Sequence, residues 1–503
     1  MRNRPAGLAC IVLMVAVTVE FIACMGPVKQ RRLKTSQIKT PAQEQIVGVT
    51  TIKGEEVQFD PATGSYAQGS VSGKVKGVDF KIPIGAVDRL WVMRRSVSAG
   101  RTVALVVGVS AAVAAVAVIA LAASAAGSGV RGCPFVYAWD GEQFVFDAEL
   151  YGGAISQGLQ RPDYSELPHL RAGSGAYRIL LSDELEETDY TDSLELWTVD
   201  HLAGTRAGVD SIGKLHSLGG LRPPLEARDE SGADLLLWLE APDRRIWEAP
   251  PAKLPNGRLR HEIVMSFAKP PAAQTAKLLV HSGSGAWGIQ MLSTLYELYG
   301  RDLDARMAVL DRNPAEAQSI RDWSVREDVY VLKVWVEEPS GWQVRGFIPG
   351  GGMGAWVVPL DVSRVPADRL RIRVPPPAGF WAINAAAVDY NAGQPLQVTR
   401  IAPSEARSQA GVSVARELQN ADGVYYKAVP GDRAEVVFPA PPERVGMSRT
   451  VFLASRGYYR PDVRSTAAPD TAALQEIFTV PDGMARFAAK RYAAWRAAAG
   501  STN

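Results

Sequence analysis

The sequence predicts a mainly β protein, with a small barrel, one Ala/Val-rich helix of membrane type, and then antiparallel β-sandwich domains that carry a helical insertion. Three observations support this fold class. Short runs in which apolar and polar residues alternate recur between Gly and Pro turns over most of the chain. Residues 102–130 contain no charged side chain. Apolar residues at helical spacing occur mainly within residues 286–325 and near the C-terminal end.

The composition argues against several classes of function. The 503 residues are 47% apolar and 21% charged, which is enough apolar material for two or three buried cores. The 55 basic and 53 acidic side chains give a net charge of +2. This balance argues against nucleic acid as the main partner, because phosphate binding needs concentrated positive charge. If the N-terminal segment is removed, Cys24 and Cys133 remain; with Cys24 acylated, they offer neither an intramolecular disulfide nor a cysteine zinc site.

The N-terminal residues are typical of an export signal. Arg2 and Arg4 precede an apolar run at residues 8–19, which is shorter than the roughly 20 residues that span a bilayer. A small residue then stands directly before Cys24. This pattern resembles a bacterial lipobox, which implies a signal peptide at residues 1–23 and lipid, such as palmitate, on Cys24. We therefore expect a membrane-anchored protein of the cell envelope, on the outer membrane or the periplasmic side.

Two segments are expected between the signal and the hydrophobic stretch. Residues 24–45 are polar and basic, which predicts a flexible linker. Residues 46–97 show short alternating strands separated by Gly turns, which favours a small β-barrel. Within them, residues 82–92 resemble the last strands of an SH3-like or Sm-like barrel. That resemblance implies a shape and no particular activity.

Residues 102–126 form a second hydrophobic segment. As a helix they would reach roughly 36 Å, enough for one bilayer crossing, so we expect a transmembrane helix here, with a helix buried in the protein body as the alternative. Its small residues would allow copies of the helix to pack closely, which predicts a possible homo-oligomer. Arg94, Arg95 and Arg101 precede the segment and only Arg131 follows it, opposite to the positive-inside rule for an exported N-terminus. We therefore expect the whole mature chain to be exported.

The remaining residues predict four segments: a β-sandwich domain at 132–285, a helical segment at 286–325, a second β-sandwich domain at 326–460 and a C-terminal helical tail at 461–503. The individual elements include a strand at 235–239 and helices at 289–298 and 484–498. Residues 133–141 and 144–149 resemble a stretch that recurs in large exported bacterial proteins of unknown function. No functional residue follows from that resemblance.

No catalytic, metal-binding or cofactor-binding residue is assigned. His261 lacks the second histidine that a zinc-protease helix would place after Glu262. His281 precedes Ser284 by three residues, but a base and its nucleophile normally meet through the fold, so a structural turn is favoured. The glycine run at 350–354 is followed by strand-like residues, which predicts a loop and not a nucleotide cradle.

One acidic stretch is a weaker candidate. It could offer oxygen ligands to calcium, but it lacks the Asp-x-Asp-x-Asp-Gly spacing of a calcium loop, so a solvated hairpin rim is favoured. Its members are Asp183, Glu184, Glu186, Glu187, Asp189 and Asp192.

Two classes of function remain open. The first is a non-catalytic scaffold or interaction protein that is anchored to the envelope membrane and has a protein or glycan partner. The alternative is a carbohydrate-binding module, or a hydrolase that acts on envelope polysaccharide. In the hydrolase, Asp147 and Glu149 would lie on one strand face as acid and base.

Overall fold

The computed structural model describes residues 28–95, apart from 36, 37, 39, 40, 42, 43, 61 and 62, and residues 134–500, apart from 244, 250, 256, 367 and 464. The chain divides into two compact units, Met1–Ala112 with Ala138–Phe146 and Val113–Tyr137 with Asp147–Asn503. The described residues are mainly β, as the sequence predicts. Among the helices that they form, none combines the length and the apolar content needed to cross a bilayer. The predicted hydrophobic helix at 102–126 lies outside the described residues.

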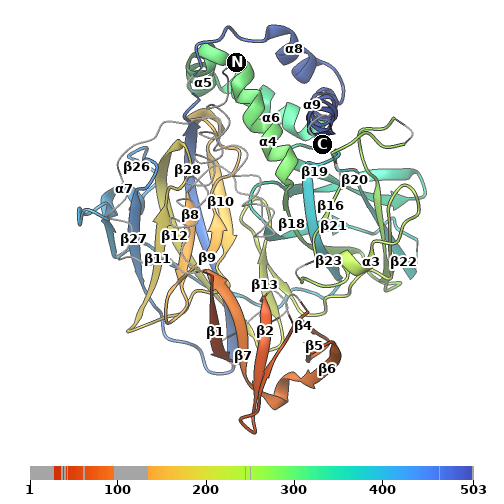
Figure 1. The fold of residues 1–503 in the computed structure, drawn as a ribbon, viewed down its shortest axis with the longest axis vertical. Coiled ribbons are helices and arrows are strands. Elements are labelled where there is room, and N and C mark those ends of the chain that lie inside the picture. Colours follow the sequence, from red (N-terminus) through yellow and green to blue (C-terminus); the bar gives the residue numbers. More distant parts are fainter. Residues whose placement is uncertain are drawn as a thin grey trace, which may run out of the picture. The chain divides into compact units, whose positions relative to one another are not determined.

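The first unit contains two small antiparallel sheets that share one core (Figure 1). Their strands are β1 (Val28–Lys34), β2 (Ile46–Thr51), β3 (Glu56–Gln58), β4 (Ser65–Ala67), β5 (Ser70–Val75), β6 (Val78–Pro83) and β7 (Val87–Arg95). One sheet has the order β1-β7-β2-β3 and the other the order β4-β5-β6. Apolar side chains from both sheets, such as Val49, Val71 and Leu90, fill the core between them.

The two sheets of the first unit do not close into the barrel that the sequence predicts. The break lies between β6 and β7, which are separated by the 3₁₀ helix η3 (Ile84–Ala86). β6 ends at Pro83, which has no N–H to donate to a further strand. The chain therefore turns from one sheet into the other at this point, and the expected barrel is a small open pair of sheets.

Part of the predicted linker is a strand. Residues 28–34 form β1, which pairs with β7 along its whole length. Leu33 is buried in the core of the unit. Arg32 places its guanidinium 4.0 Å from the ring centroid of Trp91 and donates to Glu56 at 3.1 Å. The polar composition that predicts a tether thus reflects side chains that bind neighbouring strands.

The second unit, together with residues 138–146 of the first, contains two pairs of sheets, and the first pair is assembled from both ends of the unit (Figure 1). Its strands are β8 (Phe135–Trp139), β9 (Phe144–Glu149), β10 (Arg161–Glu166), β11 (Ala176–Ser182), β12 (Glu187–Leu202), β24 (Gln397–Ile401), β25 (Glu405–Ser408), β26 (Tyr426–Ala428), β27 (Arg433–Pro439) and β28 (Met447–Pro461). One sheet has the order β10-β28-β12-β24, with β26 also paired to β12. The other has the order β25-β27-β11-β8-β9.

The second pair of sheets is built from residues that lie between β12 and β24 in the sequence. Its strands are β13 (Arg206–Val209), β14 (Leu215–Leu218), β15 (Glu226–Arg228), β16 (Trp247–Glu248), β17 (Ile263–Lys269), β18 (Thr275–Ser284), β19 (Val331–Glu338), β20 (Gly341–Pro349), β21 (Gly354–Asp361), β22 (Asp368–Val374) and β23 (Trp381–Asp389). The two sheet orders are β14-β13-β21-β18-β23-β16 and β15-β17-β22-β19-β20. This pair of sheets is therefore an insertion into the first pair.

Strands from the two segments expected as separate sandwiches, 132–285 and 326–460, share sheets. β12 pairs with β28 from Glu187 to Leu202, and β11 pairs with β27. Among the described strands, only β28 has a length similar to that of β12, and the two pair over that length. Sequence patterns indicate where strands lie but not which strands pair. The sharing of sheets between the two segments therefore could not be predicted from the sequence.

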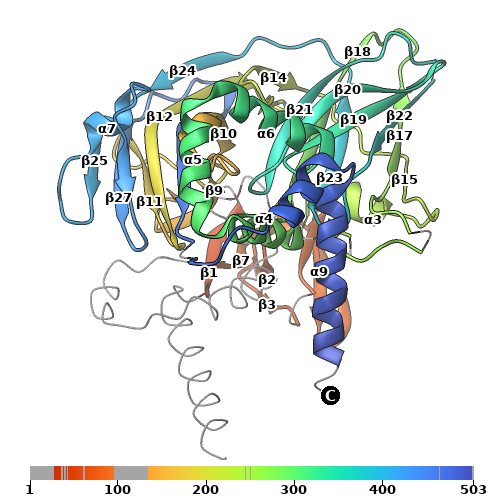
Figure 2. The same ribbon diagram turned by 90° about the horizontal axis from the view of Figure 1, so that it is seen from above.

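Most of the helices lie in segments where the sequence predicts helix, with two exceptions. They are α3 (Leu236–Leu239), α4 (Ala286–Leu298), α5 (Leu303–Arg312), α6 (Pro314–Glu327), α7 (Ala415–Gln419), α8 (Thr471–Thr479) and α9 (Gly483–Gly500). Figure 2 shows α9 beside α4, and the two helices contact each other. One exception is α7, which lies within the predicted second sandwich domain at 326–460. The other is α3, where a strand is expected at 235–239. The Asp234 carboxylate accepts from the Leu236 N–H at 2.9 Å and starts a helical turn instead.

Ion pairs attach the C-terminal helices to the inserted sheets. Arg260 donates to Asp328 at 2.7 Å, to the Glu327 carbonyl at 2.9 Å, and to Asp482 at the start of α9. Asp328 has a left-handed backbone, with φ of 55°, and ends α6. Because Arg260 bridges three segments far apart in sequence, it fixes the helices over one end of the inserted sheets.

Candidate functional site

The predicted lipid-acceptor residue, Cys24, lies outside the described residues, as does Cys133. Lipidation therefore stays a prediction from the sequence.

Asp147 and Glu149, the two carboxylates proposed for a hydrolase, are both buried in the protein. The side chain of Asp147 is fully buried. One of its oxygens accepts from the His169 backbone N–H at 3.1 Å, and the other bonds to the His169 ring. Glu149 is also buried, two residues further along β9. Both oxygens of Asp147 are thus engaged within the protein, which leaves this group little capacity to protonate a substrate.

The serine and histidine at the end of β18 do not form a nucleophile and base pair. Ser284 accepts a hydrogen bond from the Gly351 N–H at 3.0 Å through its Oγ. His281 is buried, and burial together with the nearby positive charge of Arg206 lowers the pKa of His281 to about 3. The glycine run belongs to the connection between β20 and β21, as predicted. The glycine run holds Ser284 through the Gly351 N–H and packs within the inserted sheets.

The acidic stretch is divided by the fold. Asp192 accepts from Gln160 at 3.0 Å and from the Gly423 N–H at 2.8 Å. Glu184 accepts from the Tyr137 hydroxyl at 2.8 Å. The other side of the hairpin brings together three carboxylates whose oxygens lie within 4.8 Å of one another. They are Asp183, Glu187 and Asp189, and all three are buried.

Asp183, Glu187 and Asp189 together form what we call the acidic cluster, and burial raises the pKa of two of its members. Burial raises the pKa of Asp183 to about 7, and the negative charge of Asp432 adds to the effect. Burial raises the pKa of Asp189 well above its usual value, with further contributions from Glu187 and Asp183. The predicted solvated rim is wrong for these three side chains. The period of two places Glu187 and Asp189 on one strand face, and here that face points inward.

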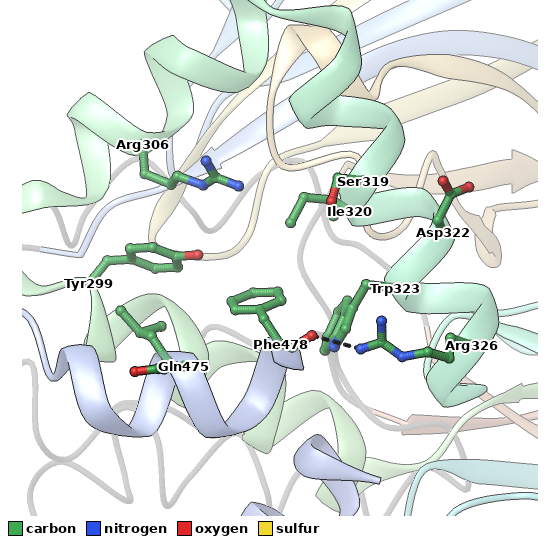
Figure 3. Close-up of a pocket in the computed structure, with 10 residues that line it drawn as sticks. Tyr299, Arg306, Ser319, Ile320, Asp322, Trp323, Arg326, Gln475 and Phe478 are labelled. Atoms are coloured by element: carbon green, nitrogen blue, oxygen red, sulfur yellow. Dashed lines mark hydrogen bonds between the residues drawn. The ribbon is translucent and has the colours of Figure 1, made fainter. Parts of the chain in front are cut away.

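A pocket of about 440 Å³ lies between helices α5, α6 and α8 (Figure 3). Its apolar walls are the rings of Tyr299, Trp323 and Phe478, and Trp323 and Phe478 have centroids 4.8 Å apart. The hydroxyl end of Tyr299 and the guanidinium of Arg306 point toward the same space (Figure 3). Arg326 also lines the pocket and donates to the Phe478 carbonyl at 2.7 Å. The pocket therefore combines aromatic faces with two cationic side chains.

The hydrogen bonds around the pocket fix its walls. Trp323 donates to the Ile477 carbonyl at 3.1 Å, which joins α6 to α8. Arg306 donates to Glu316 at 2.9 Å and bonds to Tyr299. Burial raises the pKa of Tyr299, so its hydroxyl keeps its proton at neutral pH. The volume falls in the range of about 300 to 1,000 Å³ that is typical of small-molecule sites.

Sequence patterns do not indicate this pocket. Six of its residues lie within the predicted helical segment 286–325: Tyr299, Arg306, Ser319, Ile320, Asp322 and Trp323. Phe478 comes from the predicted tail at 461–503, and only the folding of α8 onto α6 brings it there. Aromatic residues at helical spacing are ordinarily core residues, so nothing in their order distinguishes a pocket wall.

No protein-family model matches the sequence, and no curated protein matches it. Among solved structures, the chain is similar to a β-porphyranase of glycoside hydrolase family 86 from the human gut bacterium Bacteroides plebeius, with a TM-score of 0.14 and 7% identity over 48% of this chain and 36% of that one. An α-xylosidase of glycoside hydrolase family 31 from Xanthomonas citri gives a TM-score of 0.16 and 11% identity over 81% of this chain and 34% of that one. The chain spans about a third of the length of each enzyme. TM-scores this low carry no argument about function.

Proposed function

We propose that this chain is a lipoprotein of the cell envelope that acts as a non-catalytic scaffold or interaction protein. Lipid on Cys24 supplies the membrane anchor, and the hydrophobic segment at 102–126 supplies a second membrane contact. The second unit, with its layered sheets and the helical pocket, is the part that binds a partner. The sequence around Cys24 supports the anchor, and the helical pocket supports the binding role.

The observation that carries the non-catalytic role is the environment of Asp147. A general acid must reach the atom that it protonates, directly or through one water. The Asp147 side chain is fully buried, and each of its oxygens bonds to His169. Removal of those bonds would leave a buried charge without a partner, which costs about 1 to 3 kcal/mol or more. These contacts therefore support a stabilising role for the Asp147–His169 pair.

Catalysis can be tested with the purified full chain. Peptidoglycan and other envelope polysaccharides are incubated with the protein, and the release of reducing ends is measured. We expect no release above that of a buffer blank. Release by the wild-type protein that disappears in Glu149→Gln, with the circular dichroism spectrum retained, would contradict the proposal and support the hydrolase alternative.

A second candidate function, glycan binding, is favoured by the composition of the helical pocket. Sugar rings can stack their C–H faces on aromatic side chains such as Tyr299 and Phe478, while their hydroxyls bond to guanidinium groups. Arg306 and Arg326 occupy suitable positions on the pocket wall. This pocket would make the chain a carbohydrate-binding module, in agreement with the alternative that the sequence leaves open.

Glycan binding can be tested with two arginines of the same helix. Arg306→Ala removes a guanidinium from the pocket, whereas Arg312→Ala removes an exposed one that donates only to the Ala308 carbonyl at 3.1 Å among the described contacts. We expect Arg306→Ala to weaken binding on a glycan array about tenfold or more, as the loss of a charged hydrogen bond does, and Arg312→Ala to leave it unchanged. Equal binding by both variants would contradict this candidate.

A further inference from the structure

The acidic cluster is built at the turn between β11 and β12, far from the helical pocket in sequence. Asp183 directly follows β11, Glu187 begins β12, and Asp189 lies two residues further on the same face. The three carboxylates are 2%, 4% and 0% exposed. Glu149, on β9, adds to the negative charge around Asp189. The short turn of the hairpin therefore forces at least three acidic groups into one buried volume.

Three buried oxygens of Asp183 and Asp189 have no hydrogen-bond partner among the described residues. Neither carboxylate oxygen of Asp189 has one, and neither does Oδ2 of Asp183. An ionised carboxylate buried without a partner is costly, and its charge must be neutralised by a proton or by a cation. The unpartnered side chain of Asp189 is fully buried and points into the cluster, so it marks the place where a cation would be bound.

No cationic side chain is found among the described residues that line the space beside Asp183 and Asp189. They include two further oxygen-bearing groups, Tyr426 and Asp432. A metal cation is therefore a suitable counter-charge for the unpartnered oxygens of Asp183 and Asp189.

We propose that Asp183, Glu187 and Asp189 bind a calcium ion that neutralises the turn between β11 and β12. Calcium takes six to eight oxygen ligands in flexible geometry, which suits carboxylates on a strand and a turn. Magnesium demands a near-ideal octahedron and usually keeps several waters, so three carboxylates held by a strand and a turn suit it less well. The oxygen ligands also disfavour zinc and copper, which prefer nitrogen and sulfur.

The test uses the purified full chain after treatment with EDTA. Calcium and magnesium are titrated separately, at concentrations up to about 10 mM, above the affinity range of weak extracellular calcium sites. Binding is measured by isothermal titration calorimetry, and the midpoint of thermal unfolding, Tm, is measured at each concentration. We expect one calcium per chain and a Tm that rises with calcium concentration, because the ion binds the folded state. Magnesium should produce the smaller rise.

Two variants on one strand make the test specific. Asp189→Asn removes a ligand charge, so it should abolish the calcium response and raise the Tm of the metal-free protein by relieving repulsion. The control is Asp192→Asn, since Asp192 is also buried but bonds to Gln160 and Gly423 away from the cluster. It should lower the Tm equally with and without calcium and keep the calcium response.

Several results would overturn the proposal. A wild-type protein that binds no calcium in this range would show that protons neutralise the cluster instead. An Asp189→Asn variant with the full wild-type calcium response would place the ion elsewhere. Because the site shares no residue with the helical pocket, failure here leaves the glycan-binding test and the Cys24 anchor unaffected.

Discussion

At the scale of single residues, the described part of the protein places several titratable side chains in apolar surroundings. His281 is the clearest case, since burial and the charge of Arg206 lower its pKa to about 3. The folded protein therefore keeps His281 neutral at pH values where an unfolded chain, with a histidine pKa near 6.5, already binds a proton. The stabilising contribution of this residue is complete above about pH 6.5 and is lost as the pH falls toward 3.

This linkage gives a prediction for His281→Leu. Between about pH 6.5 and pH 3, the wild-type free energy of unfolding should fall by up to about 1.4 kcal/mol per pH unit because of this group. The variant should lack that component, since leucine does not titrate. Urea unfolding at pH 7 and at pH 5 measures the difference. Identical pH slopes for the two proteins would show that His281 titrates normally in the folded state.

Residue identity in the sequence indicates part of the chemistry and not its surroundings. The acidic stretch is visible as a run of six carboxylates, and the spacing of Glu187 and Asp189 predicts that they share a face. Which face is buried depends on the segments packed against it, and the residues beside Asp189 include Pro134, Tyr426 and Asp432 from separate parts of the chain. Asp147 presents the same limit, because its partner His169 bonds to it only after folding.

At the scale of elements, the strands and helices with strong periodicity are predicted and the weak ones are not. The helices α4 and α9 match the expected segments at 289–298 and 484–498. α3 replaces a predicted strand, because four apolar residues fit either structure and Asp234 decides the outcome. β1 is missed because its sequence is basic, although its backbone pairs with β7 and its Leu33 side chain is buried.

The pairing of β1 gives a second prediction. Leu33→Ala should destabilise the first unit by about 2 to 5 kcal/mol, because it removes a buried side chain from that unit's core. Lys34→Ala, at the exposed end of the same strand, should change stability by about 0.5 kcal/mol or less. Hydrogen exchange of amides in β7 measures both effects. Equal protection in the two variants would contradict the role of β1 in the core and would support a flexible tether at residues 28–34.

At the scale of the whole molecule, one core joins the two pairs of sheets of the second unit. The hydrophobic cluster that includes Leu278 and Leu332 of the inserted sheets also includes Val199 on β12 and Phe452 on β28. The α4 and α9 side chains Leu295 and Met484 belong to the same cluster. A shared core couples the stability of the pairs, since neither can lose its packing without exposing apolar surface of the other.

We therefore predict that the second unit unfolds in one cooperative transition. Differential scanning calorimetry should give a single peak for this unit, and tryptophan fluorescence and far-ultraviolet circular dichroism should report the same midpoint. Phe452→Ala, which alters β28, should lower hydrogen-exchange protection in the inserted β19 as well as in β12. Two separated transitions, with β19 unaffected by the variant, would mean that the two pairs of sheets fold independently.

The most direct measurement of the central claim, that this is a lipid-anchored binding protein of the cell envelope, is metabolic labelling with a radioactive fatty acid. Cells expressing the full chain are compared with cells expressing Cys24→Ala and, as the control, Cys133→Ala. We predict that label is incorporated into the wild-type protein and Cys133→Ala and is absent from Cys24→Ala. Label that persists in Cys24→Ala, or a wild-type protein that takes up none, would contradict the account.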